Sequence, residues 1–222
     1  MRHIAGTFYT WPMPPKKKPT PEAGRKSAYV ARNRATIINA ALEVLAQNGV
    51  HATMDQVAEA SGMAMSTVYK HFKDKDELVA TVLLEKFMEW EAWVTEKNVL
   101  NTDPLEQLVF PMRMFVRIPQ THPNQAKVFV SHFGVIASIT QILEVQLIEH
   151  VKDLTKSKVL TANDPRAAAK NLQAIISFAV VNQVINPKFT VADADSSIRT
   201  ALSMLGISEA KAKKLTEAKL PL

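Results

Sequence analysis

The sequence predicts an all-α protein in which a small N-terminal three-helix unit is joined to a larger helical bundle. From about Tyr29 onward the apolar residues recur with a period near 3.6, and no stretch shows the sustained alternation of a half-buried strand. Helix-start signals recur along the same region and predict about nine helices. The 222 residues include only six glycines, which leaves little room for the tight turns of an all-β fold.

The composition excludes several classes of protein. The chain has no cysteine, which excludes a disulfide scaffold, a thiolate nucleophile and a Cys-ligated zinc site. No apolar run reaches the roughly 18 residues of a membrane helix, and prolines interrupt the N-terminal stretch where a secretion signal needs an unbroken apolar segment. We therefore expect a soluble, cytoplasmic protein that does not enter a membrane.

No pattern of residues indicates catalysis or a bound metal. Paired carboxylates, a nucleophile with its base and a Gly-rich cofactor loop do not stand out. His122, His132 and His150 do not share the spacing of metal ligands on one helix. We expect no enzyme activity, no metal site and no cofactor.

Positive charge is concentrated at the N-terminus. Residues 1–35 hold eight Lys and Arg against one Glu, whereas the rest of the chain holds 19 basic and 20 acidic residues. Residues 1–28 are rich in Pro and Lys and lack a helical or strand period, which predicts a disordered basic arm. Such a block is either a solvated tail or an arm that binds nucleic acid. The rest of the chain is predicted to form two domains, residues 29–80 and 81–222.

The first four helices are marked by local signals. A helix over residues 31–47 carries its apolar residues on one face and ends at Asn48-Gly49. The capping-box pattern Thr53-Met-Asp-Gln56 begins a helix over residues 53–60, and a helix over residues 65–72 follows the turn around Gly62. A second box, Asp74-Lys-Asp-Glu77, begins a fourth helix that continues through Trp93.

The later helices have similar signals. Asp103-Pro104 and Asp164-Pro165 each place a proline at the first helical position, where its missing N–H costs nothing. Thr190 and Asp193 have the spacing of another box, and residues 208–222 are predicted to form an exposed basic helix.

Residues 53–72 have the pattern of a helix-turn-helix, in which two short helices are joined through Gly62. Val68 and Phe72 give the second helix an apolar face that can pack on the first two helices. Its other face presents hydrogen-bonding groups that suit base edges and phosphates. These groups belong to Ser66, Thr67, Tyr69, Lys70 and His71.

These residues lie within a longer resemblance. Residues 31–87 resemble the N-terminal domain of the TetR/AcrR family of transcriptional regulators. The most specific match is the string Thr67-Val-Tyr-Lys-His-Phe72 followed by Asp74-Lys75 and Leu78. The resemblance implies that the larger domain binds a ligand and dimerises, and that the helix after the turn contacts double-stranded DNA.

The predicted DNA-contacting residues follow from this resemblance and from the polar face. For Tyr69, packing beneath the second helix is an equal alternative to DNA contact. Lys75 places a positive charge at the positive end of the helix dipole, which is unfavourable. A DNA phosphate bound there would make the position favourable, because the ammonium group and the free helix amides would share one anion. The full set is Thr53, Met65, Ser66, Thr67, Tyr69, Lys70, His71 and Lys75.

The sequence departs from the family pattern at the start of the second helix. Members commonly have Ser followed by a cation here, whereas this chain has Ala64-Met65-Ser66. Ala64 cannot cap the helix, and Met65 can make only apolar contact, for instance with a thymine methyl group. We therefore expect a half-site that favours A·T pairs.

Residues 36–80 hold three lysines against six acidic residues, which alone would give weak DNA binding. The basic arm can compensate for this deficit. Four of its cations immediately precede or begin the first helix, where family members with long tails can reach the minor groove. They are Arg25, Lys26, Arg32 and Arg34.

The best candidate for an apolar ligand pocket lies in residues 87–133, which hold five of the nine Phe and two of the three Trp. Arg113, Arg117 and His132 could orient a ligand there, although Arg117 could instead pair with a neighbouring acid. An ordinary helical core explains the same aromatic pattern. The predicted pocket residues are Phe87, Trp90, Trp93, Met112, Arg113, Phe115, Phe129, His132 and Phe133.

The last two long helices are the predicted dimer interface. Apolar residues cover more than one face of the helix after Asp164, which is too wide for a monomer core alone, and the family pairs its last helices across a two-fold axis. The predicted interface residues are Leu172, Ile176, Val180, Ile198 and Leu202. The resemblance thus implies a homodimeric repressor that leaves an inverted-repeat operator when a small apolar effector binds. The alternative is an architectural or effector-independent DNA-binding protein.

Overall fold

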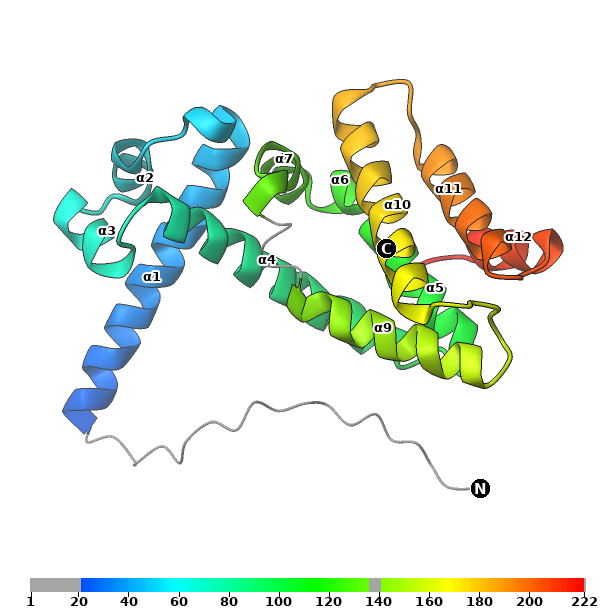
Figure 1. The fold of residues 1–222 in the computed structure, drawn as a ribbon. Helices are drawn as coiled ribbons and strands as arrows, with labels where there is room; N and C mark the ends of the chain where they lie inside the picture. Colours follow the sequence, from blue (N-terminus) through cyan, green and yellow to red (C-terminus); the bar gives the residue numbers. More distant parts are fainter. Residues whose placement is uncertain (1–20, 136–140, 222) are drawn as a thin grey trace. The chain divides into compact units, whose positions relative to one another are not determined.

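The computed structural model describes residues 21–135 and 141–221, and its described part is helical with no strand. The all-α prediction is therefore confirmed (Figure 1). The chain divides into two compact units, residues 1–36 and 37–222, and α1 (Pro21–Asn48) contributes to both. Residues 1–20 of the predicted arm lie outside the described residues.

Residues 21–28 correct the prediction of a disordered arm, because they form the first turns of α1. Pro21 stands at the first helical position, where proline is favoured, and the next residues include good helix formers such as Ala and Arg. The arginines and lysine expected on an extended arm are therefore carried by a helix.

The second unit begins with the predicted helix-turn-helix. The 3₁₀ turn η1 (Gly49–His51) leads into α2 (Met54–Ser61), α3 (Met65–His71) and α4 (Lys75–Asn98). Buried side chains from α1 to α4 form one cluster, with Ile37, Leu45, Val57, Phe72 and Leu78 among its members. No break occurs near residue 80, where a domain boundary was predicted, because α4 runs straight through it.

The remaining helices form the larger bundle. They are α5 (Pro104–Phe115), α6 (Ile118–Thr121), α7 (Pro123–Ser131), α9 (Gln141–Lys156), α10 (Pro165–Ile185), α11 (Val191–Met204) and α12 (Glu209–Glu217). Helix α10 packs against both α9 and α11, as Figure 1 shows. The short helices α6 and α7 were not predicted; they begin beside Pro119 and Pro123, which start new helices after each turn.

The local capping signals gave most helix starts. Thr53 and Thr190 both form reciprocal capping boxes, with Gln56 and Asp193 respectively. Asp74 caps α4 through the amide of Glu77, but the Glu77 carboxylate accepts from the amide of Lys73 at 2.7 Å instead of closing a box on Asp74. The second predicted box is therefore only half formed.

Candidate nucleic-acid interface and internal cavity

Gly62 makes the turn between α2 and α3 possible. Its φ of +65° lies in the left-handed region, where a residue with a Cβ is strained by about 1–2 kcal/mol. Its amide donates back to the carbonyl of Glu59, and the amide of Met63 donates to Ala58, so the end of α2 is satisfied within the turn. The chain therefore reverses in three residues, and α3 packs on α2.

Helix α3 has one buried face and one open face. Val68 is fully buried and Phe72 nearly so, which fixes the rotation of the helix on the cluster beneath it. Ser66, Tyr69 and Lys70 are exposed on the other side. Tyr69 exposes 51% of its surface, so it does not pack beneath the helix, which was the alternative to DNA contact.

The start of α3 matches the departure seen in the sequence. Ala64 is the N-cap residue and makes no side-chain cap. Met65 is partly buried and packs against the apolar cluster, so only part of its side chain is left for a thymine methyl group. Thr67 and His71 are also partly buried at the margin of the open face.

Lys75 has partners that the sequence did not predict. Its ammonium group donates to the carbonyl oxygens of Val50 at 2.8 Å and Ala52 at 3.1 Å, which end the turn η1. These carbonyls offset the unfavourable position of a lysine in the first turn of α4. An ammonium group has three donors, so contact with a phosphate remains compatible with these two bonds.

Thr53 is exposed and caps α2 by accepting from the Gln56 amide at 3.2 Å. Arg25, Lys26 and Arg32 are exposed on the first turns of α1, and Arg34 is partly buried there. The described part of the first unit therefore carries all four predicted arm cations on one helix.

A cavity of about 450 Å³ lies among α4, α5, α7, α9 and α10. Five of the nine predicted pocket residues line it, namely Phe87, Trp90, Met112, Phe115 and Phe129. The rings of Phe115 and Phe129 meet edge to face, and Trp90 does the same with Phe115. The aromatic concentration in the sequence thus located part of the wall.

Four predicted pocket residues lie elsewhere. The ring of Trp93 contacts the ring of His122, and the ammonium group of Lys97 lies over the Trp93 ring. Phe133 is partly exposed beside Phe129, and His132 is buried at the end of α7. Arg113 is buried in an ion-pair cluster and does not reach the cavity.

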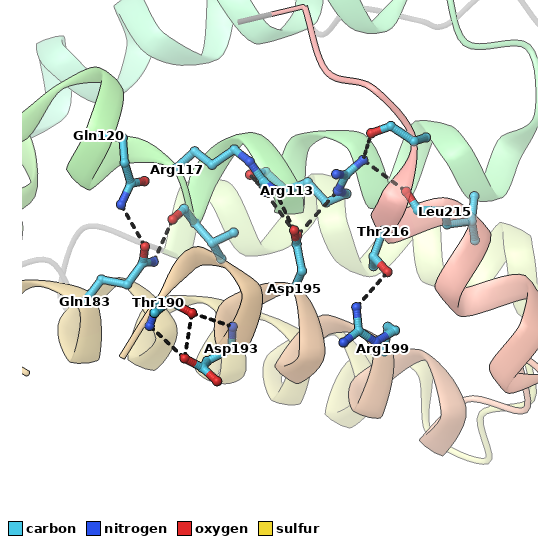
Figure 2. Close-up of polar contacts among 12 residues, drawn as sticks. Arg113, Arg117, Gln120, Gln183, Thr190, Asp193, Asp195, Arg199, Leu215 and Thr216 are labelled. Carbon is cyan, nitrogen blue, oxygen red and sulfur yellow. Dashed lines mark hydrogen bonds and ion pairs between the residues drawn. The ribbon is translucent and has the colours of Figure 1, made fainter. Parts of the chain in front are cut away.

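Figure 2 shows that Arg113 and Arg117 both bind the carboxylate of Asp195 and so hold helices together. Asp195 of α11 accepts from the Nε of Arg113 at 3.4 Å and from the Nη1 of Arg117 at 3.0 Å. Arg113 also donates to the carbonyls of Leu215 and Ala218. Burial lowers the pKa of Arg113, and the Asp195 carboxylate opposes that shift. The cluster ties α5 to α11 and to the end of α12, and the pairing of Arg117 with an acid is confirmed.

Several polar cavity residues were missed. Glu91, Thr95 and Asn98 continue the stripe of Phe87 along α4 at helical spacing, which was a usable signal. Others come from helices whose contribution depends on packing, and they are Gln107, Gln146, His150, Gln173 and Ser177.

The prediction of the dimer-interface residues was wrong, because these side chains pack within their own chain. Leu172, Val180, Ile198 and Leu202 are all buried within this chain, at 2% exposure or less, and Ile176 is partly buried against the same core and lines the cavity. Side chains enclosed by their own chain cannot contact a partner. The wide apolar surface of α10 instead serves the core on one face and leaves Phe178 and Ile185 exposed on another.

Across residues 21–135 and 141–221, no helix is long and apolar enough to cross the bilayer. No group of three or more His, Asp or Glu side chains in that part of the chain is placed to hold a metal ion.

Comparison with known proteins agrees with this geometry. Residues 37–82 match the model of bacterial regulatory proteins of the tetR family. The transcriptional regulator RutR of Escherichia coli K12 is 25% identical over 109 residues, which are 48% of this chain and 50% of RutR. The transcriptional repressor KstR of Mycobacterium tuberculosis is 23% identical over 145 residues, or 65% of this chain and 66% of KstR. The match to RutR therefore spans about half of that protein's length.

Among solved structures, RolR bound to resorcinol superposes with a TM-score of 0.71 over 88% of this chain and 98% of RolR. The sequence identity is 18%, so this similarity establishes the fold alone.

Proposed function

We propose that this chain is a sequence-specific DNA-binding transcriptional regulator, and specifically a repressor that a small molecule releases from its operator. The match of residues 37–82 to the model of bacterial regulatory proteins of the tetR family supports this proposal. The observation that carries the proposal is the open face of α3, where Ser66, Tyr69 and Lys70 stand exposed over the buried Val68. A short polar helix held this way suits the major groove.

The charge of the helix-turn-helix makes the α1 cations part of the proposal. Residues 36–80 carry more acids than bases, so the phosphate attraction has to come from elsewhere. Arg25, Lys26 and Arg32 are exposed on α1 and are proposed to supply it. Lys75 contributes a further phosphate contact through its remaining donor.

The cavity favours a ligand-responsive regulator over an architectural DNA-binding protein. An architectural protein needs no internal space, whereas about 450 Å³ is the size of a small-molecule site. The bound resorcinol of RolR is a small molecule of this kind.

Two helices connect the proposed ligand site with the proposed DNA-binding face. Helix α4 begins beside α3 and lines the cavity farther along with Phe87, Trp90 and Glu91. Helix α7 places Val128 in the cluster of the helix-turn-helix and the next residue, Phe129, in the cavity wall. A ligand that moves either helix needs a coupling of only about 1–3 kcal/mol to release the operator 5- to 150-fold.

The proposed partner is a second copy of the chain, seated on α10 and α11. Exposed residues of α10 recur at helical spacing as Ala167, Asn171, Ala174, Phe178 and Ile185. Phe178 and Ile185 expose 62% and 63% of their surface and lie on the same face of the helix as the small Ala167 and Ala174. The exposed residues of α11 are mostly small, as in Ala192, Ser196 and Ser203, so two copies can approach closely. The dimer would present two α3 helices to an inverted repeat.

The test is selection of sheared genomic DNA by the full chain at near-physiological salt, with the bound fragments sequenced. We expect discrete sites that share an inverted repeat. An Arg25→Gln/Lys26→Gln variant keeps α1 and should lower both the affinity for those sites and the salt slope, by about 0.9 for each lost phosphate contact. Lys213→Gln/Lys214→Gln on α12 removes the same charge and should leave binding unchanged. Only diffuse, salt-sensitive binding would favour the architectural alternative.

A further inference from the structure

The residues described at the cavity wall include a carboxylate but no lysine or arginine. The ionisable groups among them are Glu91 of α4 and His150 of α9. A ligand that carries a carboxylate, sulfonate or phosphate would therefore enter an apolar space with no cation to pair with it. Such burial of an unpaired charge is strongly unfavourable.

Three of the other polar side chains at the cavity, those of Asn98, Gln107 and His150, already have partners. Asn98 donates to the carbonyl of Gln107 at 3.0 Å and accepts from Asn101 at 2.8 Å. The Gln107 side chain donates to the carbonyl of Asn101, and His150 lies 3.3 Å from the carbonyl of Pro104. These bonds hold the ends of α4, α5 and α9 and are not free to select a ligand.

Glu91 differs from them. It is half-buried at the cavity wall, and no ion pair or hydrogen bond reaches its carboxylate from residues 21–135 or 141–221. Burial raises the pKa of Glu91, which is the response of a carboxyl group that lacks a compensating cation. A cation in the cavity would remove that penalty.

The aromatic wall favours the same charge. Phe87 and Trp90 are neighbours of Glu91 on α4, with ring centroids 5.5 Å apart, and Phe115 and Phe129 complete the wall. The faces of these rings are electron-rich and attract a cation, more strongly when the site is shielded from water.

We infer that the cavity binds an organic cation with an apolar body, whose positive centre pairs with the Glu91 carboxylate between the aromatic rings. The inference rests on the proposed function only in taking the cavity as the effector site. It excludes anionic effectors.

The test uses two rigid ions of nearly equal size, tetraphenylphosphonium and tetraphenylborate, titrated calorimetrically into the full chain without DNA. We expect the phosphonium to bind at least tenfold more tightly than the borate. Glu91→Gln should weaken phosphonium binding about tenfold or more, which is about 1.4 kcal/mol, and should strengthen borate binding. Glu96→Gln, an exposed position on the same helix outside the cavity wall, should change neither.

Equal binding of the two ions, a preference for the borate, no effect of Glu91→Gln, or no binding of either ion would overturn the inference. Circular dichroism of each variant shows that it is folded. Because the titration contains no DNA, the two proposals can fail separately. If the chain selects no discrete genomic sites but binds the phosphonium, the proposed regulatory function is refuted and the cation site is not. Discrete genomic sites with no cation preference would do the reverse.

Discussion

The side-chain amide of Asn98 donates to the carbonyl oxygen of Gln107 at 3.0 Å, and that carbonyl is the one Pro111 leaves unpaired inside α5. Proline has no N–H, so the regular bond from residue 111 to residue 107 cannot form. A residue at the end of α4 therefore completes the hydrogen bonding of α5 beside the cavity.

This relationship predicts a coupled pair of substitutions. Asn98→Ala should lower the free energy of unfolding by about 1–3 kcal/mol, because it leaves the part-buried carbonyl of Gln107 without its donor. In a Pro111→Ala background the backbone supplies the missing N–H, so the same change should cost at least 1 kcal/mol less, roughly the value of one hydrogen bond. Urea unfolding of the four proteins measures the difference. Equal losses in both backgrounds would show that Asn98 does not serve this carbonyl.

Asp195 is predicted to be essential for the stability of the bundle. Asp195→Asn would leave Arg113 and Arg117 buried without a counter-charge, and losing one partner of a buried pair costs about 3–5 kcal/mol. Thermal unfolding measures the effect. Glu217→Gln, which breaks the exposed pair with Lys213, should cost less than about 1 kcal/mol. A loss at Asp195 as small as this control would refute the structural role of the cluster.

Stability is predicted to fall in mild acid. Burial lowers the pKa of His122, His132 and His150, so below their ordinary value of about 6.5 the unfolded chain binds more protons than the folded one. Their contribution is complete above that pH and is lost as the pH falls through the lower folded pKa values. Glu91 acts in the opposite sense because its pKa is raised, so its contribution is lost as the pH rises through that value.

His132 allows this prediction to be tested at one residue. Its Nε2 is buried without a hydrogen-bond partner among the described residues, and the charge of Lys75 further lowers its pKa. His132→Gln should flatten the decline in unfolding free energy between pH 7.5 and 5, as followed by urea titration at each pH. His51→Gln, at an exposed position, should keep the wild-type profile. Identical slopes for wild type and His132→Gln would contradict the assignment.

The proposed dimer face predicts different outcomes at neighbouring positions of α10. Phe178→Glu should give folded monomers, since it places a charge on an exposed face. Val180→Glu should unfold the chain, because Val180 is only 1% exposed and an unpaired buried charge is not tolerated. Light scattering and circular dichroism separate the two results. Met88→Glu, another exposed apolar position, should remain dimeric, and a dimeric Phe178→Glu would move the interface elsewhere.

Local sequence signals predicted the longer helices and the helix-turn-helix, although not α6, α7 or the first turns of α1. Thr53 and Thr190 cap their helices as predicted, because a capping box depends on a residue only three positions away. Pro104 and Pro165 stand at the first positions of their helices, as was also predicted. Gly62 between two short amphipathic helices was sufficient for the turn, for the same local reason.

Tertiary structure alone decided which helical face meets which neighbour. An apolar stripe shows that a face is buried, but Leu172 and Val180 meet their own core whereas Phe178 does not, and periodicity cannot separate these cases. Arg113, Lys75 and Glu91 follow the same rule. Arg113 pairs with Asp195 and Lys75 with the carbonyls of Val50 and Ala52, whereas Glu91 pairs with nothing in the described chain. The partners of Arg113 and Lys75 lie 23 to 105 positions away in the sequence, and only packing brings them together.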